Sequence, residues 1–151
     1  MSDLRDLYQQ MIVDHSKRPR NFRKLETANR SAEGFNPLCG DQVNVYLEVI
    51  DGIVKMASFE GSGCAISTAS ASLMTDAIKM KSVAEVEVLF QQFHELVTGH
   101  ESDAKVLGKL TVFAGVSGFP ARVKCASMAW HTLRDALKNR DAVVGTTEGE
   151  K

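Results

Sequence analysis

The sequence predicts an α+β fold in which helices cover a small antiparallel sheet of three strands. Residues 42–50 alternate apolar and polar side chains, a two-residue turn signal follows them, and the second half of the chain has the residue types and spacing of helices. Strands that come first and helices that come afterwards are typical of an antiparallel sheet with helices packed on it.

The amino-terminal segment predicts an amphipathic helix that ends near Pro19. Its apolar side chains recur at helical spacing, and they are Leu4, Leu7, Tyr8, Met11, Ile12 and His15. A polar, irregular stretch follows over residues 21–30. A short strand is expected at residues 31–35.

The next two segments predict a β-hairpin. Residues 42–50 form the first strand, and its apolar side chains would share one half-buried face. These side chains are Val43, Val45, Leu47 and Val49. Asp51 and Gly52 give a two-residue turn signal, and a second strand is expected over residues 53–59.

Helices dominate the rest of the chain. The expected helical segments cover residues 65–80, 82–99, 101–116 and 119–140. Gly61 and Gly63 would end the preceding strand, Gly99 would stop the second helix, and Pro120 suits the first turn of the last one.

Length and composition indicate one globular domain that spans residues 1–151. With 18 Lys and Arg against 19 Asp and Glu, the formal charge of -1 gives no net field to hold nucleic acid. No segment approaches the roughly 20 apolar residues of a membrane helix, and the amino terminus lacks the layout of a secretory signal. Three cysteines without an export signal indicate reduced thiols. We therefore expect a cytoplasmic protein that binds neither nucleic acid nor membranes.

The three cysteines lie in settings that favour chemistry over packing. Cys39 and Asp41 flank Gly40 in a turn-rich loop, so that a thiolate and a carboxylate could face one point. Cys64 opens a helix, whose amino terminus carries partial positive charge. Cys125 is in the last helix, near Arg122 and Lys124.

Spacing alone does not identify a metal site, because the chain lacks the paired Cys-x-x-Cys knuckles of a zinc finger. The four histidines, at positions 15, 94, 100 and 131, are best interpreted as structural or surface residues. Ser67, Ser70 and Ser72 lack the Gly-x-Ser-x-Gly elbow of a hydrolase, so we interpret them as small residues that allow helix packing.

Three motifs in order along the chain resemble the ligand segments of the IscU/NifU-type iron-sulfur cluster assembly family. They are NPLCGD at 36–41, GSGCAISTASASLM at 61–74 and RVKCASMAW at 122–130. Two departures, Lys124 where the family's scaffolds have a histidine and a longer stretch between Cys64 and Cys125, resemble the SufU branch. Arg122, three residues before the last cysteine, is also typical of that branch.

The resemblance implies a SufE/NifU-like fold and a zinc ion bound by Cys39, Asp41, Cys64 and Cys125. It also implies a SufS-like cysteine desulfurase as partner, and iron-sulfur scaffolds or apo-proteins downstream. The extra region, 83–116, would enlarge the core through its stripe of apolar residues or shape partner choice, and the first interpretation is favoured. The stripe consists of Val86, Leu89, Phe90 and Phe93.

The leading hypothesis is zinc-dependent sulfur transfer, with Cys39 as the acceptor of persulfide sulfur and Arg122 in a supporting role. One alternative is a scaffold on which a [2Fe-2S] cluster, or iron, is bound by the same four residues. Lys124 weighs against it, because an ammonium group is a poor cluster ligand. A second alternative is a purely structural zinc-binding interaction module.

Overall fold

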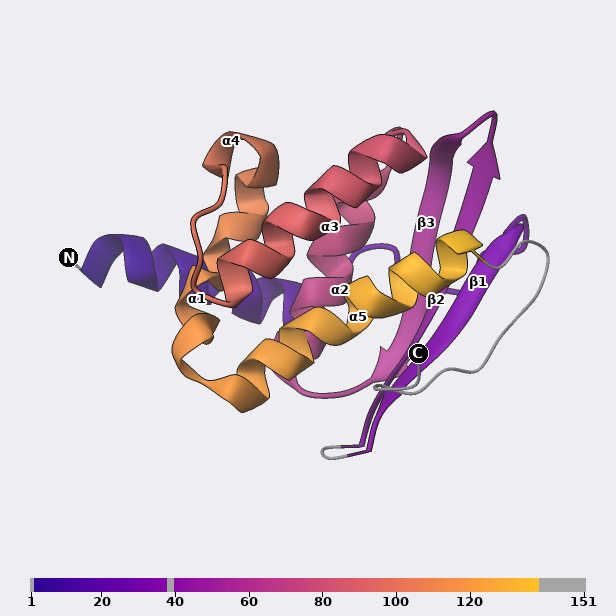
Figure 1. The fold of residues 1–151 in the computed structure, drawn as a ribbon. Helices are drawn as coiled ribbons and strands as arrows, with labels where there is room; N and C mark the ends of the chain where they lie inside the picture. Colours follow the sequence, from indigo (N-terminus) through magenta and orange to yellow (C-terminus); the bar gives the residue numbers. More distant parts are fainter. Residues whose placement is uncertain (1, 38–39, 139–151) are drawn as a thin grey trace.

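Residues 2–37 and 40–138 are described in a computed structural model (Figure 1). The predicted α+β fold is confirmed. The elements, in chain order, are α1 (Ser2–Lys17), β1 (Arg30–Asn36), β2 (Asp41–Ile50), β3 (Ile53–Ser62), α2 (Ala65–Ile78), α3 (Val83–Val97), α4 (Ala104–Leu107), the 3-10 helix η1 (Gly108–Gly118) and α5 (Pro120–Lys138). Within these ranges no helix combines the length and apolar character that crossing a membrane requires.

The three strands form one antiparallel sheet in the order β1-β2-β3. The alternation in β2 has the predicted effect, because its odd-numbered residues from Asp41 to Val49 are all buried. In the β2–β3 pairing Val45 lies opposite Phe59, and the predicted turn at Asp51 and Gly52 has positive φ at both residues. A hairpin of this kind needs two such residues. The strand predicted at 31–35 is present as β1.

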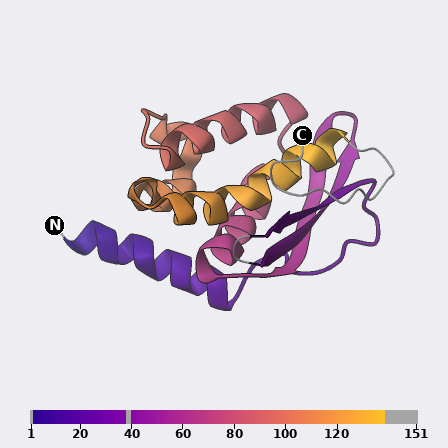
Figure 2. The same cartoon turned by 60° about the horizontal axis from the view of Figure 1, so that its bottom comes forward.

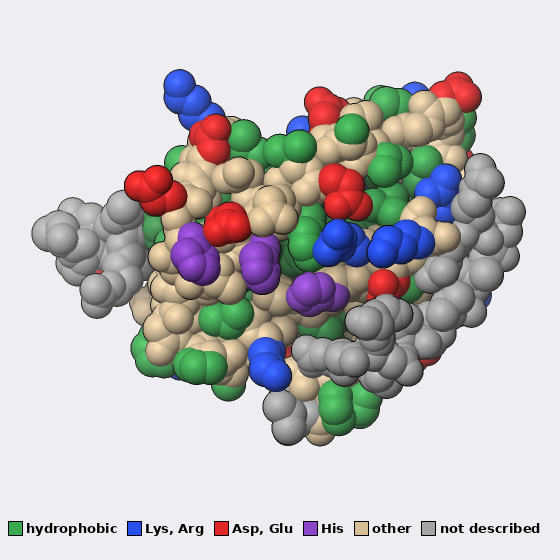
Figure 3. Space-filling view, in the orientation of Figure 1, with side chains coloured by type: hydrophobic (Ala, Val, Ile, Leu, Met, Phe, Trp, Pro, Cys, Tyr) green, Lys and Arg blue, Asp and Glu red, His purple; other side chains and the backbone are tan. Residues whose placement is uncertain are grey.

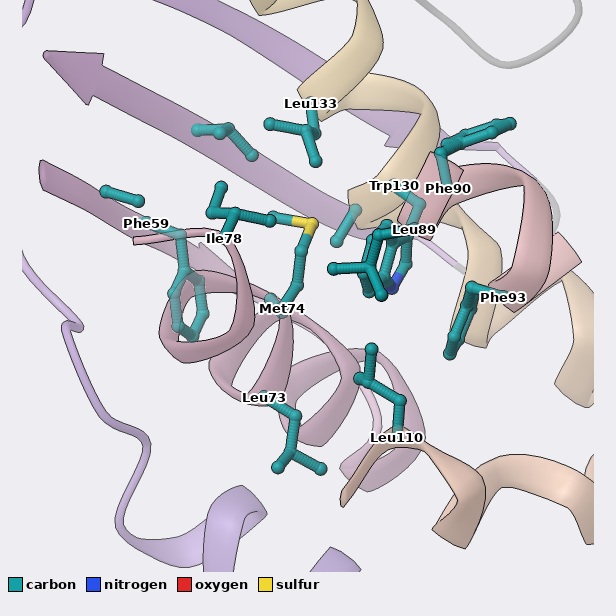
Figure 4. Packing of buried hydrophobic residues seen from close by; sticks show 14 of the residues in the cluster. Phe59, Leu73, Met74, Ile78, Leu89, Phe90, Phe93, Leu110, Trp130 and Leu133 are labelled. Atoms are coloured by element: carbon teal, nitrogen blue, oxygen red, sulfur yellow. The ribbon is translucent and has the colours of Figure 1, made fainter. Parts of the chain in front are cut away.

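Two helices cover the buried face of the sheet. Helix α5 lies against β1 and β2, and α2 lies against β3, as the two ribbon views show (Figures 1 and 2). Side chains from α2, α3, η1 and α5 fill the space between the helices, where Trp130 and Met74 are central (Figure 4). The ring of Phe93 stacks on Trp130 with centroids 4.6 Å apart. Since Val86, Leu89, Phe90 and Phe93 are all buried, region 83–116 enlarges the core as expected.

The segment at 101–116 differs from the continuous helix that its residue types predict. It forms the single turn α4, followed by η1. Gly108 joins the two with a positive φ of 55°, which interrupts the helical hydrogen-bond ladder. Apolar spacing alone did not reveal this break.

Helix α1 packs its apolar face only in part. Tyr8, Met11 and Ile12 contact the core, and His15 is buried, as the spacing predicts. Leu7, by contrast, is 59% exposed, because the amino-terminal half of the helix projects away from the rest of the molecule (Figure 2). Pattern reasoning placed Leu7 on the covered face, and that prediction was wrong.

Candidate metal centre

Three distant segments meet at one end of the sheet. Asp41 is the first residue of β2, Cys64 precedes α2, and Cys125 lies in the second turn of α5. Because Gln42 pairs with Ser62, the end of β3 delivers Cys64 beside Asp41. Helix α5 contacts β1, β2 and α2, and it contributes Cys125 to the same site.

Asp41 is only 4% exposed, and within the described residues two donors hold its carboxylate. The Ser67 hydroxyl donates to Oδ2 over 2.6 Å, and the backbone N–H of Cys64 donates to Oδ1 over 3.3 Å. Gly63 makes this close approach possible. A Cβ at Gly63 would lie 2.9 Å from Asp41 Cγ, from Asp41 Oδ1 and from Ser67 Oγ.

Cys64 is the N-cap residue of α2 and is exposed to solvent. Its side chain makes no capping hydrogen bond, and its Sγ lies 3.4 Å from Ser67 Oγ. The thiol is therefore accessible, and it stands where the partial charge of the helix end favours an anion.

Cys125 is partly buried, and a hydrogen-bonded serine fixes its neighbourhood. The Ser70 hydroxyl donates to the carbonyl of Ala126 over 2.6 Å and accepts from Trp130 Nε1 over 3.1 Å. These two bonds tie α2 to α5 directly beside Cys125. They thereby set the spacing between Cys64 and Cys125.

Asp41, Cys64 and Cys125 form a group that could hold a metal ion. Their potential ligand atoms all lie within 4.8 Å of one another, and no other group of three such residues occurs in the described part of the chain. Sulfur ligands around a tetrahedral zinc stand about 3.8 Å apart, given Zn–S bonds of about 2.3 Å. The two thiols and the carboxylate therefore fit zinc after a small closure, and a fourth position remains for another ligand.

The structure gives different information on the other two predicted site residues, Cys39 and Arg122. Cys39 lies outside the described residues, so its predicted ligand and acceptor roles stay predictions. Arg122 is exposed on α5, with its guanidinium 4.6 Å from the centre of the Phe119 ring. Lys124 is also exposed.

The histidines are structural or surface residues, as the sequence indicated. His15 is 5% exposed, and its Nδ1 lies 2.7 Å from Ser72 Oγ. Burial lowers the pKa of this imidazole below its ordinary value. The other three are exposed, and histidine side chains are visible beside lysine and arginine side chains on the face that α3 and α5 form (Figure 3). None of the four joins the group of candidate metal ligands in the described part of the chain.

Sequence reasoning missed the part that serines play at this site. Ser67, Ser70 and Ser72 are buried helix residues, as expected of packing residues, but each also makes a specific hydrogen bond. Ser67 follows Cys64 by three residues at a helix start, where side chains three apart share a face. That spacing was the available signal.

Comparison with known proteins identifies relatives along most of the chain. Residues 7–126 match the family described as the NifU-like N terminal domain. The chain is 40% identical over 139 residues to the iron-sulfur cluster assembly scaffold protein IscU of Streptococcus pyogenes serotype M1, covering 91% of this chain and 87% of that protein. It is 39% identical over 141 residues to the zinc-dependent sulfurtransferase SufU of Bacillus subtilis strain 168, covering 93% and 95%.

The fold has a counterpart among solved structures. The amino-terminal part of a nitrogen-fixing NifU-like protein from Brucella abortus superposes with a TM-score of 0.80, over 89% of this chain and 94% of that one. The two sequences are 20% identical, so this likeness concerns the fold alone.

Proposed function

We propose that this chain, which belongs to the NifU-like N-terminal domain family of iron-sulfur cluster assembly proteins, is a zinc-dependent acceptor of persulfide sulfur. A cysteine desulfurase would supply the sulfur, and scaffolds or apo-proteins of cluster biogenesis would receive it. The reducing cytoplasm, where free thiols persist, is the proposed setting. The observation that carries the proposal is the convergence of Asp41, Cys64 and Cys125, because Asp41 is close to Cys39 in the sequence.

The proposed metal ligands are Cys39, Asp41, Cys64 and Cys125. When bound, zinc keeps coordinating thiols ionised without redox chemistry of its own. Asp41 is a suitable fixed ligand because two hydrogen bonds already hold its carboxylate. Cys64 and Cys125 are anchored by their helices. Cys39, which comes between β1 and β2 in the sequence, is the proposed moving ligand.

The sulfur transfer would be ordinary thiol–disulfide exchange. The Cys39 thiolate attacks the outer sulfur of the persulfide on the desulfurase cysteine, and a new S–S bond forms. The S–S bond within the partner's persulfide breaks, and its electron pair leaves with the partner's thiolate. Arg122 is exposed one turn before Cys125, where its guanidinium would steady negative charge or contact the docked partner.

The test is to replace each cysteine with alanine and to measure desulfurase turnover with free cysteine as substrate. We expect Cys39→Ala to abolish the stimulation. If Cys39→Ala keeps full stimulation while Cys125→Ala loses it, the assignment of the acceptor is wrong. Zinc content measured on each purified variant separates loss of the acceptor from loss of the metal.

The second candidate is a scaffold for a [2Fe-2S] cluster, as the name of the Streptococcus relative suggests. The same four residues would hold the cluster. Lys124 weighs against this function, because it stands where the family's scaffolds have a histidine and an ammonium group is a poor cluster ligand. Anaerobic reconstitution, followed by absorption spectroscopy and transfer to an apo-acceptor, distinguishes the two functions. A stable cluster that transfers favours the scaffold, and tight zinc without transfer favours sulfur relay.

A structural zinc module is disfavoured by the Asp41 carboxylate in the group, because structural zinc sites usually gather four sulfur or nitrogen ligands. Alkylation of the zinc-loaded protein tests this alternative. Thiols that remain inert even with the desulfurase present would support the module.

A further inference from the structure

Ser67 stands between two of the proposed ligands. It lies in the first turn of α2 and is 5% exposed. Its Oγ is 2.6 Å from Asp41 Oδ2, 3.4 Å from Cys64 Sγ and 3.5 Å from the Cys64 carbonyl oxygen.

The single hydroxyl proton of Ser67 can serve only one acceptor at a time. The contact with Asp41 is far the shortest, and 2.6 Å is the length of a charge-assisted O–H···O⁻ bond. Ser67 therefore donates to the carboxylate. Its lone pairs remain to accept from the Cys64 thiol.

This hydrogen bond determines which carboxylate oxygen is available. Among the described residues, Oδ2 accepts the short hydrogen bond from Ser67 at 2.6 Å, whereas Oδ1 has the longer contact with the Cys64 N–H at 3.3 Å. A carboxylate that ligates a metal through one oxygen is commonly oriented by a partner on the other. The space beside the carboxylate is closed by Gly63, which fits only because it lacks a Cβ.

We propose that Ser67 is a positioning residue that fixes the Asp41 carboxylate with Oδ1 directed at the Cys64 and Cys125 thiols. This inference rests on the proposed zinc function. It explains how Asp41 stays in the ligand set while Cys39 departs. Ser67 acts through Asp41 and does not itself bind the metal.

The test is a double-mutant cycle on zinc affinity, with Ser67→Ala, Asp41→Ala and the double variant, measured by chelator competition without any desulfurase. Removal of an outer-shell partner typically costs roughly 10–100-fold in metal affinity, and we expect this loss for Ser67→Ala alone. In the Asp41→Ala background the same change should alter affinity by less than about twofold, because its only route of action is gone.

Cobalt loading gives a second readout. The visible d–d bands of the Co²⁺ protein should shift in Ser67→Ala toward those of Asp41→Ala. Ser72→Ala is the matched control, since Ser72 is a buried serine of the same helix that contacts His15 and the Arg20 amide. It should keep both the affinity and the spectrum of the natural protein.

Three results would overturn the inference. Ser67→Ala could bind zinc as tightly as the natural protein, or it could lose the same factor in both backgrounds, or Ser72→Ala could lose as much. In each case the natural protein still binds zinc, so the proposed function survives. Failure of the natural protein to bind zinc at all would overturn both.

Discussion

Replacing Gly63 with alanine tests the site through its tightest packing contact. The new methyl group would lie 2.9 Å from the Asp41 carboxyl carbon and from Ser67 Oγ, whereas carbon atoms normally pack about 3.5–4.0 Å apart. Gly63 is not among the glycines with positive φ, so alanine suits its backbone. The substitution therefore acts on the carboxylate and its serine, because these must shift.

Two magnitudes follow from this displacement. Overpacking costs about 1–3 kcal/mol and a Gly-to-Ala change returns about 0.4–1 kcal/mol, so the metal-free protein should lose up to about 2.5 kcal/mol. Saturating zinc stabilises the folded protein. If the zinc site becomes 10–100-fold weaker, this stabilisation should decrease by about 1.4–2.7 kcal/mol.

The assay is guanidinium unfolding with and without zinc, and the quantity compared is the increase in unfolding free energy that zinc produces. Gly115→Ala is the control, because a Cβ there meets nothing within 4 Å. If zinc raises the unfolding free energy of Gly63→Ala as much as that of the natural protein, the claim that the orientation of Asp41 matters for metal binding is refuted.

Further predictions concern pH and stability. Burial holds the pKa of His15 in the folded protein below 6.5. As the pH falls, the His15 imidazole is therefore protonated in the unfolded chain before it is protonated in the folded protein. The unfolding free energy of the metal-free protein should consequently fall as the pH drops below 6.5. Urea titrations across this pH range should show that the unfolding free energy of His15→Gln depends less on pH than that of the natural protein. An equal pH dependence in the two proteins would contradict the lowered pKa of His15. Ser82→Ala removes the capping box with Glu85 and should cost about 1 kcal/mol in the same assay, whereas no loss would show that α3 does not depend on its cap. Phe93→Ala should cost about 3–5 kcal/mol, because its ring stacks on Trp130, and a loss below about 1 kcal/mol would contradict the packing of α3 into the core.

Local pattern predicted the sheet well because its causes are local. The alternation from Val43 to Val49 determines burial, and the Asp51-Gly52 turn joins the paired strands. The register shift between Glu48 and Val49 has no counterpart in that pattern. The segment after residue 100 was harder, since a single backbone angle at Gly108 changes one helix into α4 and η1. The exposure of Leu7 depends on whether other elements pack against the amino-terminal half of α1. The spacing of apolar residues does not contain that information.

The site was predicted in part, for a similar reason. Cys64 and Cys125 are 61 positions apart, and only the packing of α2 on α5 brings them together, so family resemblance was needed to group them. Asp41 and Cys64 meet for a different reason, because the pairing of β2 with β3 places Ser62 opposite Gln42. Ser67 was missed because several serines follow Cys64, and the sequence does not say which one faces the carboxylate.

The most direct test of the central claim is the location of the transferred sulfur. The protein is incubated with a cysteine desulfurase and cysteine, alkylated, digested and analysed by mass spectrometry. Sulfur relay predicts one additional sulfur atom on the peptide that contains Cys39, while the peptides of Cys64 and Cys125 remain unmodified. Additional sulfur on Cys64 or Cys125, with none on Cys39, would contradict it.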